Sequence, residues 1–228
     1  MNNALLRLLH LTDPTLPIGG FAHSSGLETY VQAGVVHDQQ TASDFVRQML
    51  DKNLQYTDAA FVSLAFDAME TQNYESVLSL DSICNAVKLP KEIRQASQKL
   101  CLRLLKIFQP LLKDEMIDFY ASAIRKKEAY GHYCIAFGLI ARSLGIPKNE
   151  VLIGFYYNAA IGFVTNCVKL IPLGQQQGQE LIFSLQNLIE ELAEKSLNPD
   201  PEMTGACCPG FDIRSMQHER LYSRLYMS

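Results

Sequence analysis

Charge is scarce in this sequence, and its scarcity excludes one class of partner. Only 19% of the 228 residues are charged, and the formal net charge is −4. The longest basic run is Arg125-Lys126-Lys127, so the chain has no electrostatic footprint for binding nucleic acid. With 48% hydrophobic residues, it has either a large core or an apolar surface that partners cover, and composition does not separate the two.

Long apolar runs are also missing. No stretch reaches the roughly 18–20 consecutive apolar residues that a membrane-spanning helix needs. The apolar part of Met1 to Arg7 is too short for a signal peptide. We therefore expect a cytoplasmic protein without membrane association, whose six cysteines are reduced thiols.

The familiar sequence patterns of catalysis and metal binding are absent too. The cysteines form no C-x-x-C pair, the histidines show no H-E-x-x-H spacing, and no P-loop follows Gly19-Gly20. No nucleophile has an evident base, so we expect no enzymatic activity and no cofactor. One weaker reading stays open, because a Gly-Gly loop that leads into a helix can hold an anion.

A possible metal site is a separate interpretation, and it concerns a few histidines and cysteines. Cys207, Cys208 and His218, with His23, could carry nickel, because thiolate and imidazole groups bind such metals. The alternative is that the two adjacent cysteines are exposed thiols in a flexible loop.

Helical periodicity runs through most of the chain, and no segment alternates long enough for a sheet. We expect an all-α fold, a single-domain bundle of about ten helices over residues 1–196. A flexible loop and an extended, partner-docking tail, aromatic and basic, follow at 197–228. The predicted helices are 4–11, 25–33, 41–54, 57–71, 74–87, 90–108, 114–127, 130–144, 148–170 and 175–196.

Two capping boxes are predicted, and two stretches break the helical pattern. Ser25 to Glu28 and Thr41 to Asp44 have the spacing of a capping box. Asp13 to Gly20, with two prolines and a Gly-Gly pair, predicts a shaped loop. Leu197 to Phe211 is too polar and too rich in helix breakers to predict a helix.

Several side chains admit two interpretations. His23 either hydrogen-bonds the loop backbone or faces a partner or a metal. Glu28 is either a cap or a partner contact, and Lys169 either extends to solvent from an apolar stretch or presents its charge to a partner. The pair Tyr156-Tyr157 is either core or interface.

Three stretches together resemble one family. Leu16 to Glu28 (LPIGGFAHSSGLE) looks like the N-terminal signature of urease accessory protein F, and Cys167 to Gln175 (CVKLIPLGQ) resembles its second signature. The ending from Met216 to Ser228 is similar to the C-terminus of that family. The order and spacing of the three matches fit the whole chain, whereas about residues 57–130 carry little signature.

The resemblance implies an all-α protein without catalysis of its own. Members of the family join urease accessory protein D (also called H) and a nickel-carrying accessory GTPase, G. The complex docks on apo-urease, and nickel enters the active site after GTP hydrolysis. The resemblance also implies a homodimer and a tail that the D partner orders.

The resemblance also assigns individual residues. Phe21, His23 and Glu28 of the first signature are expected on a partner-facing or nickel-route surface, and Lys169 on the surface facing the GTPase. Tyr157 is expected at the dimer interface. Arg220, Tyr222 and Arg224 are expected to contact the D partner. The Cys207-Cys208 loop follows no family pattern, so the resemblance does not support a metal site there. The competing hypotheses are a direct nickel carrier and an all-α enzyme with an unrecognised site.

Overall fold

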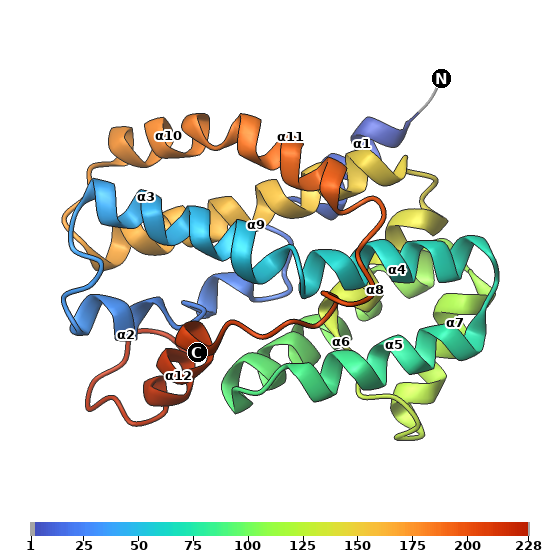
Figure 1. Cartoon of the computed structure of the whole chain (residues 1–228). Helices are drawn as coiled ribbons and strands as arrows, with labels where there is room; N and C mark the ends of the chain where they lie inside the picture. Colours follow the sequence, from blue (N-terminus) through green and yellow to red (C-terminus); the bar gives the residue numbers. More distant parts are fainter. Residues whose placement is uncertain (1–2, 228) are drawn as a thin grey trace.

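The computed structural model describes residues 3–227, and in that range it has twelve α-helices and no strand, which confirms the all-α prediction. Figure 1 shows these helices packed against one another along most of their lengths. Their bounds are α1 Ala4–Leu11, α2 Leu27–Gln32, α3 Gln39–Gln48, α4 Asp58–Glu70, α5 Tyr74–Val87, α6 Lys91–Leu112, α7 Glu115–Arg125, α8 Tyr133–Ser143, α9 Lys148–Leu170, α10 Gln175–Ser184, α11 Gln186–Lys195 and α12 Pro209–His218. A 3-10 turn, η1 (Gly20–Ala22), and a π-helical segment, η2 (Met49–Leu54), complete the list.

The core is built around α8. Eight consecutive residues of α8, Cys134 to Ala141, are buried, because α4 and α6 pack along it. Gly138 permits the close approach of α4, since a side chain there would collide with the carbonyl oxygen of Val62. Backbone-to-backbone packing of this kind fixes the spacing of the helices that position the site.

Helix α9 is long and apolar enough to cross a membrane by length and composition. The sequence analysis predicted no segment of this kind, so the apolar character of α9 needs an explanation other than a membrane. It packs against α11, α10, α4 and α3, and 56% of its most apolar window is buried inside the protein. Its composition is that of a core helix.

Both predicted capping boxes are wrong. Ser25 has a positive φ of 54°, Gly26 lies in the left-handed region, and α2 begins at Leu27 without a side-chain cap. The box of α3 lies three residues earlier than predicted, with Asp38 as the N-cap and Thr41 completing it. The Gly-Gly pair leads into the short turn η1 and not directly into a helix, so it offers no helical anion site.

The C-terminal region differs from the predicted extended tail. Residues 209–218 form α12, with Pro209 in its first turn, where proline is tolerated. This helix packs against α2 and α6, and Phe211 joins the main core. The predicted helix over 175–196 is divided into α10 and α11, with the buried Leu185 at the break.

A buried carboxylate organises the loop before α8. Asp81 on α5 accepts hydrogen bonds from the Tyr120 hydroxyl (2.6 Å) and from the backbone N–H groups of Tyr130 (2.6 Å), Gly131 (3.0 Å) and His132 (3.2 Å). Its negative charge also lies at the N-terminus of α8, where it interacts favourably with the helix dipole.

His132 is buried beside this carboxylate in its neutral form. Its Nε2 lies 3.3 Å from the side-chain oxygen (Oδ1) of Asn85, which can only accept, so Nδ1 (3.2 Å from the Ser97 hydroxyl) is the acceptor. The pKa of His132 is lowered to about 4: burial is the largest cause, Lys88 and Arg94 act in the same direction, and Asp81 and Asp58 oppose them.

This shift predicts acid sensitivity. The unfolded chain binds a proton on His132 at about pH 6.5, whereas the folded chain does so only near 4. Between these values the unfolded state holds more protons, so the free energy of unfolding should fall by up to about 1.4 kcal/mol per pH unit as pH drops. Urea unfolding at several pH values measures this slope. His132→Gln should reduce it, and equal slopes in the two proteins would contradict the assignment.

Candidate functional site

The loop that carries the first signature is held from two sides. Arg103 on α6 donates to the Ile18 carbonyl oxygen (2.8 Å), and the Asn166 amide on α9 donates to the His23 carbonyl oxygen (2.9 Å). Gly19 adopts a φ of 82° there, and a side chain at this position would collide with the Arg103 guanidinium. The loop is therefore fixed by its backbone, which leaves its side chains available for other contacts.

A cavity of about 390 Å3 lies between this loop, α6 and α9. Its lining is mostly apolar, with Leu16, Ile93 and Phe155 among the contributors, and it includes Phe21, His23 and Lys169. Three residues expected at the functional site are therefore brought together by the fold. A concave, largely apolar site with a few polar groups is the usual form of a binding site.

The cavity lining also contains a buried ion pair that the sequence did not indicate. Lys88 Nζ lies 2.7 Å from Asp58 Oδ2. Burial alone would raise the pKa of Asp58, but the ammonium of Lys88 outweighs burial and lowers that pKa. Burial alone would lower the pKa of Lys88, and the carboxylate in turn raises it. Both groups are held in their charged forms, so the pair adds no net charge to the cavity.

The three expected residues at this cavity differ in exposure. Phe21 is 74% exposed, Lys169 is exposed, and His23 is partly buried. Burial lowers the pKa of His23, and the nearby cations of Lys99 and Arg103 lower it further, while Glu92 opposes them. The neutral form of the His23 imidazole is therefore favoured, so Lys169 is the one of these three residues that brings a positive charge to the cavity.

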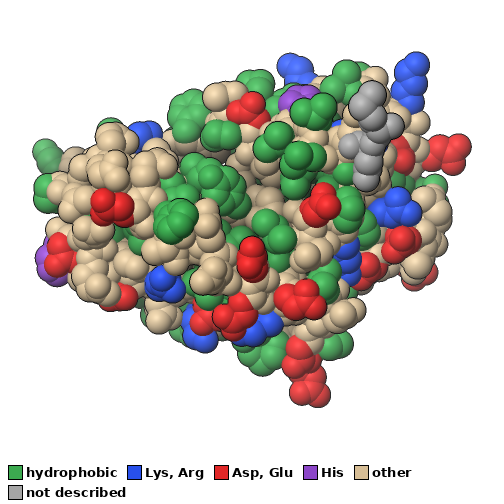
Figure 2. All heavy atoms as spheres, turned by 90° about the horizontal axis from the view of Figure 1, so that it is seen from above, with side chains coloured by type: hydrophobic (Ala, Val, Ile, Leu, Met, Phe, Trp, Pro, Cys, Tyr) green, Lys and Arg blue, Asp and Glu red, His purple; other side chains and the backbone are tan. Residues whose placement is uncertain are grey.

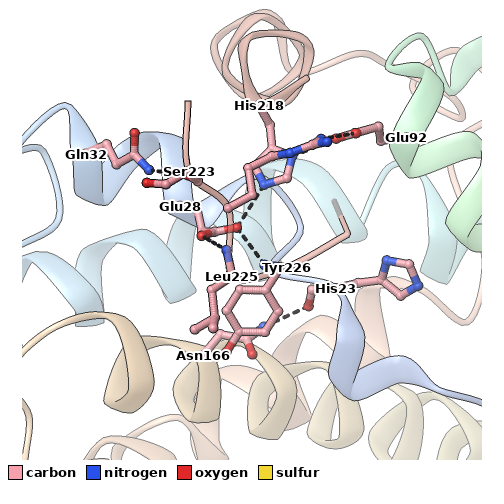
Figure 3. Close-up of polar contacts among 10 residues, drawn as sticks. His23, Glu28, Gln32, Glu92, Asn166, His218, Ser223, Leu225 and Tyr226 are labelled. Carbon is pink, nitrogen blue, oxygen red and sulfur yellow. Dashed lines mark hydrogen bonds and ion pairs between the residues drawn. The ribbon is translucent and has the colours of Figure 1, made fainter. Parts of the chain in front are cut away.

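Glu28 is not on the surface while the tail is in place. Figure 3 shows its carboxylate beneath the C-terminal segment, facing His218 and the backbone of Leu225 and Tyr226. Its Oε1 accepts from the Leu225 N–H (2.7 Å), and its Oε2 accepts from the Tyr226 N–H (3.0 Å). Glu28 thus anchors the tail from α2 and does not cap that helix.

His218 lies between two carboxylates. Its Nε2 is 2.9 Å from Glu28 Oε2, and its Nδ1 is 2.6 Å from Glu92 Oε2. Arg224 donates to the other oxygen of Glu92 (2.7 Å). The cluster of Glu28, Glu92, His218 and Arg224, here called the tail clamp, joins α2, α6, α12 and the tail. His218 therefore bridges the two carboxylates.

The remaining expected residues lie apart from this clamp. Arg220 is exposed, and Tyr222 is fully exposed, with a relative exposure of 104%. Tyr157 is 41% exposed on α9, whereas its neighbour Tyr156 is fully buried and shares a hydrogen bond with Ser196. Tyr156 is therefore a core residue, and the interface interpretation stays a prediction for Tyr157.

The histidines and cysteines of the nickel-carrier hypothesis are not brought together as ligands. No group of three His, Cys, Asp or Glu within residues 3–227 is placed to hold a metal ion. His218 is engaged with two carboxylates. Cys207 is exposed and Cys208 is partly buried, and both line a smaller cavity of about 80 Å3.

Sequence reasoning missed the residues that connect distant segments. Glu92 lies in an ordinary helical pattern, and Gln32, which donates to the Ser223 carbonyl oxygen (3.1 Å), ends the short helix α2. Asn166 precedes the second signature by one residue. No local signal could have identified these side chains, because their partners are 132, 191 and 143 residues away.

Comparison with known proteins identifies the family of the chain. The UreF family model matches residues 36–186. The chain is 48% identical to the urease accessory protein UreF of Actinobacillus pleuropneumoniae serotype 5b (strain L20) over 221 residues, 97% of each chain. It is 48% identical to that of Haemophilus influenzae (strain PittEE), over 97% of this chain and 94% of the relative. It is 37% identical to that of Lachnoclostridium phytofermentans over the full length of both.

These matches define the class: the chain is a urease accessory protein. Within that class, the chain belongs to the UreF family. The family model stops short of the first signature and the tail, but the relatives align across nearly the whole chain and so include both.

Proposed function

We propose that this chain is a non-enzymatic scaffold that assembles with urease accessory protein D (also called H) and the accessory GTPase G on apo-urease. There it helps to deliver nickel in the cytoplasm and couples GTP hydrolysis to maturation of the metallocentre. The observation that carries the proposal is Phe21, which is 74% exposed on a loop held by Arg103 and Asn166. A fixed, exposed aromatic side chain beside an apolar cavity is typical of a binding hot spot.

Two faces are available for the two partners. Phe21, His23 and Lys169 surround the cavity, and we assign that face to the GTPase. The other face is the tail, where the exposed Arg220 and Tyr222 combine positive charge with aromatic surface. We assign Arg220, Tyr222 and Arg224 to the D partner, with Glu28 holding the segment that presents them.

A third surface supports a homodimer. Tyr157 lies between Gly154, which packs against Leu8 of α1, and Asn158, which donates to the carbonyl oxygen of Thr12 directly after α1. On α1, the side chains of Leu5, Leu6 and Leu9 are 63%, 66% and 56% exposed. Figure 2 shows apolar side chains gathered over the middle of the face seen from above. A second copy covering the surface around Tyr157 would bury such side chains, and interfaces between identical chains are the more apolar kind.

A pull-down with the two partners tests the scaffold. The full chain should retain both proteins. Phe21→Ala and Lys169→Glu should each weaken capture of the GTPase by about ten-fold or more, because hot-spot truncations cost at least 2 kcal/mol. Removing residues 220–228 should instead abolish capture of the D partner, and it leaves α12 and His218 in place.

The matched control is Phe183→Ala. Phe183 is as exposed as Phe21, at 73%, but it lies on α10, outside the cavity. Its replacement should leave capture of both partners unchanged. If the full chain captured neither partner, or if Phe183→Ala reduced capture as much as Phe21→Ala, the scaffold proposal would be lost.

A further inference from the structure

The last residues of the chain are bound mainly through their backbone. Glu28 accepts from the consecutive N–H groups of Leu225 and Tyr226, and the Met227 N–H donates to the Ala22 carbonyl oxygen (2.9 Å). Gln32 donates to the Ser223 carbonyl oxygen. Recognition of an extended segment through main-chain hydrogen bonds, with a place for one side chain, is a general mode of peptide binding.

The side chains of this segment contribute little burial. Leu225 is 68% exposed, Met227 57% and Tyr222 104%, and only Tyr226 is buried. The Tyr226 ring lies beside Asn166 (Figure 3). Its hydroxyl is buried without a hydrogen-bond partner in the described part of the chain, and such a group costs free energy. Side-chain burial therefore contributes little to the stability of the bound segment.

The receptor side of the contact does not depend on the segment. Glu28 is also held by His218, which belongs to α12 and contacts Glu92. Residues 219–227 form no helix or strand, and no residue beyond Phe211 belongs to the main apolar core. The segment can consequently leave while α2, α12 and the clamp residues Glu28, Glu92 and His218 stay in place.

We propose that Ala22, Glu28 and Gln32 form a binding site for an extended peptide, here called the tail site. Residues 222–227 are its ligand within the chain, and the corresponding segment of a second copy can take their place. The second copy is the occupant that fits, because it carries the same two N–H groups, the same tyrosine and the same Arg224 facing Glu92. Under the proposed function, a partner that draws the tail away would leave this site open, but the tail site itself requires no partner.

The test uses a fluorescent peptide of residues 219–227 and the full chain, with binding measured by anisotropy. Wild type should bind weakly, because its own tail competes. Leu225→Pro removes the N–H that donates to Glu28, so its tail should be loose and the peptide should bind roughly ten-fold to a hundred-fold more tightly, as expected for hydrogen bonds to a charged group. Leu225→Ala is the matched control, since it keeps the N–H and should behave as wild type does.

Peptide variants test the chemistry without altering the protein. N-methylation at Leu225 should abolish binding to the Leu225→Pro chain, and so should Tyr226→Ala. Tyr226→Phe should bind at least as well as the parent peptide, because it removes the unpaired hydroxyl. In the Leu225→Pro chain, the further substitution Glu28→Gln should weaken peptide binding by about the same factor by which Leu225→Pro strengthens it.

Two results would overturn the proposal. One is a Leu225→Pro chain whose tail is loose by hydrogen exchange but which does not bind the peptide. The other is equal binding of the parent and the N-methylated peptides. Neither result depends on the D partner or the GTPase, so failure here is distinguishable from failure of the scaffold proposal.

Discussion

Replacing His218 by alanine is expected to destabilise the protein by roughly 3–5 kcal/mol, because it leaves two carboxylates facing each other without the group between them. The side chains of Glu28 and Glu92 are only 5% and 17% exposed, and His218 itself is 1% exposed. The loss should appear as a lower urea midpoint. Faster hydrogen exchange at the amides of Leu225 and Tyr226 should accompany it, since both donate to Glu28.

A second substitution separates charge repulsion from lost packing. In the His218→Ala background, Glu92→Gln removes one of the two buried charges, so it should recover part of the lost stability. An exposed histidine provides the control. The side chain of His37 is 61% exposed, so His37→Ala should change the urea midpoint little. If Glu92→Gln lowered stability equally with and without His218, the charge explanation would be wrong.

Replacing Asp81 by alanine is expected to have a comparable effect, roughly 3–5 kcal/mol, through a different mechanism. The backbone N–H groups of Tyr130 and Gly131 and the hydroxyl of Tyr120 would lose their acceptor inside the core. Each unsatisfied buried donor costs about 1–3 kcal/mol. The His132 N–H would suffer less, because it also donates to the Tyr120 oxygen (2.9 Å).

Replacing Asp81 by asparagine is expected to cause a smaller loss of stability. Asp81→Asn keeps one acceptor oxygen but points an amide NH2 toward backbone donors, so its unfolding free energy should fall between those of wild type and Asp81→Ala. Asp118→Ala serves as the comparison, because Asp118 is exposed and, within residues 3–227, its side chain accepts a single hydrogen bond, from the Gln109 amide. An Asp81→Ala protein as stable as Asp118→Ala would show that water replaces the carboxylate.

The sequence predicted most helices because their signals are local. Apolar spacing alone placed α4, α5, α8 and α9 within a few residues of their observed bounds. It failed where two local signals competed. Pro209 and Gly210 were interpreted as helix breakers, whereas Pro209 starts α12, because proline lacks only an N–H that the first turn would leave unpaired.

The site was predicted in part, and the reason differs by residue. Phe21, His23 and Lys169 were identified from the two signatures, and the fold places them around one cavity. Glu28 was identified but interpreted as a cap or a surface contact, because its actual partners, Leu225 and Tyr226, lie almost 200 residues away. Removal of residues 212–228 would also take His218 from the clamp and most of α12 from its contacts.

By itself, the sequence determined the all-α class, the shaped loop before α2 and the membership in a family, since these follow from periodicity, breakers and order of signatures. Tertiary structure alone decided that the charge-poor chain uses the charged side chains of Glu28, Glu92 and Arg224, together with His218, to close the C-terminal segment onto α2 and α6. The physical reason is that a buried charge is tolerated only beside a partner of opposite sign or a hydrogen-bond donor, and the identity of that partner is set by folding and not by neighbours in the chain.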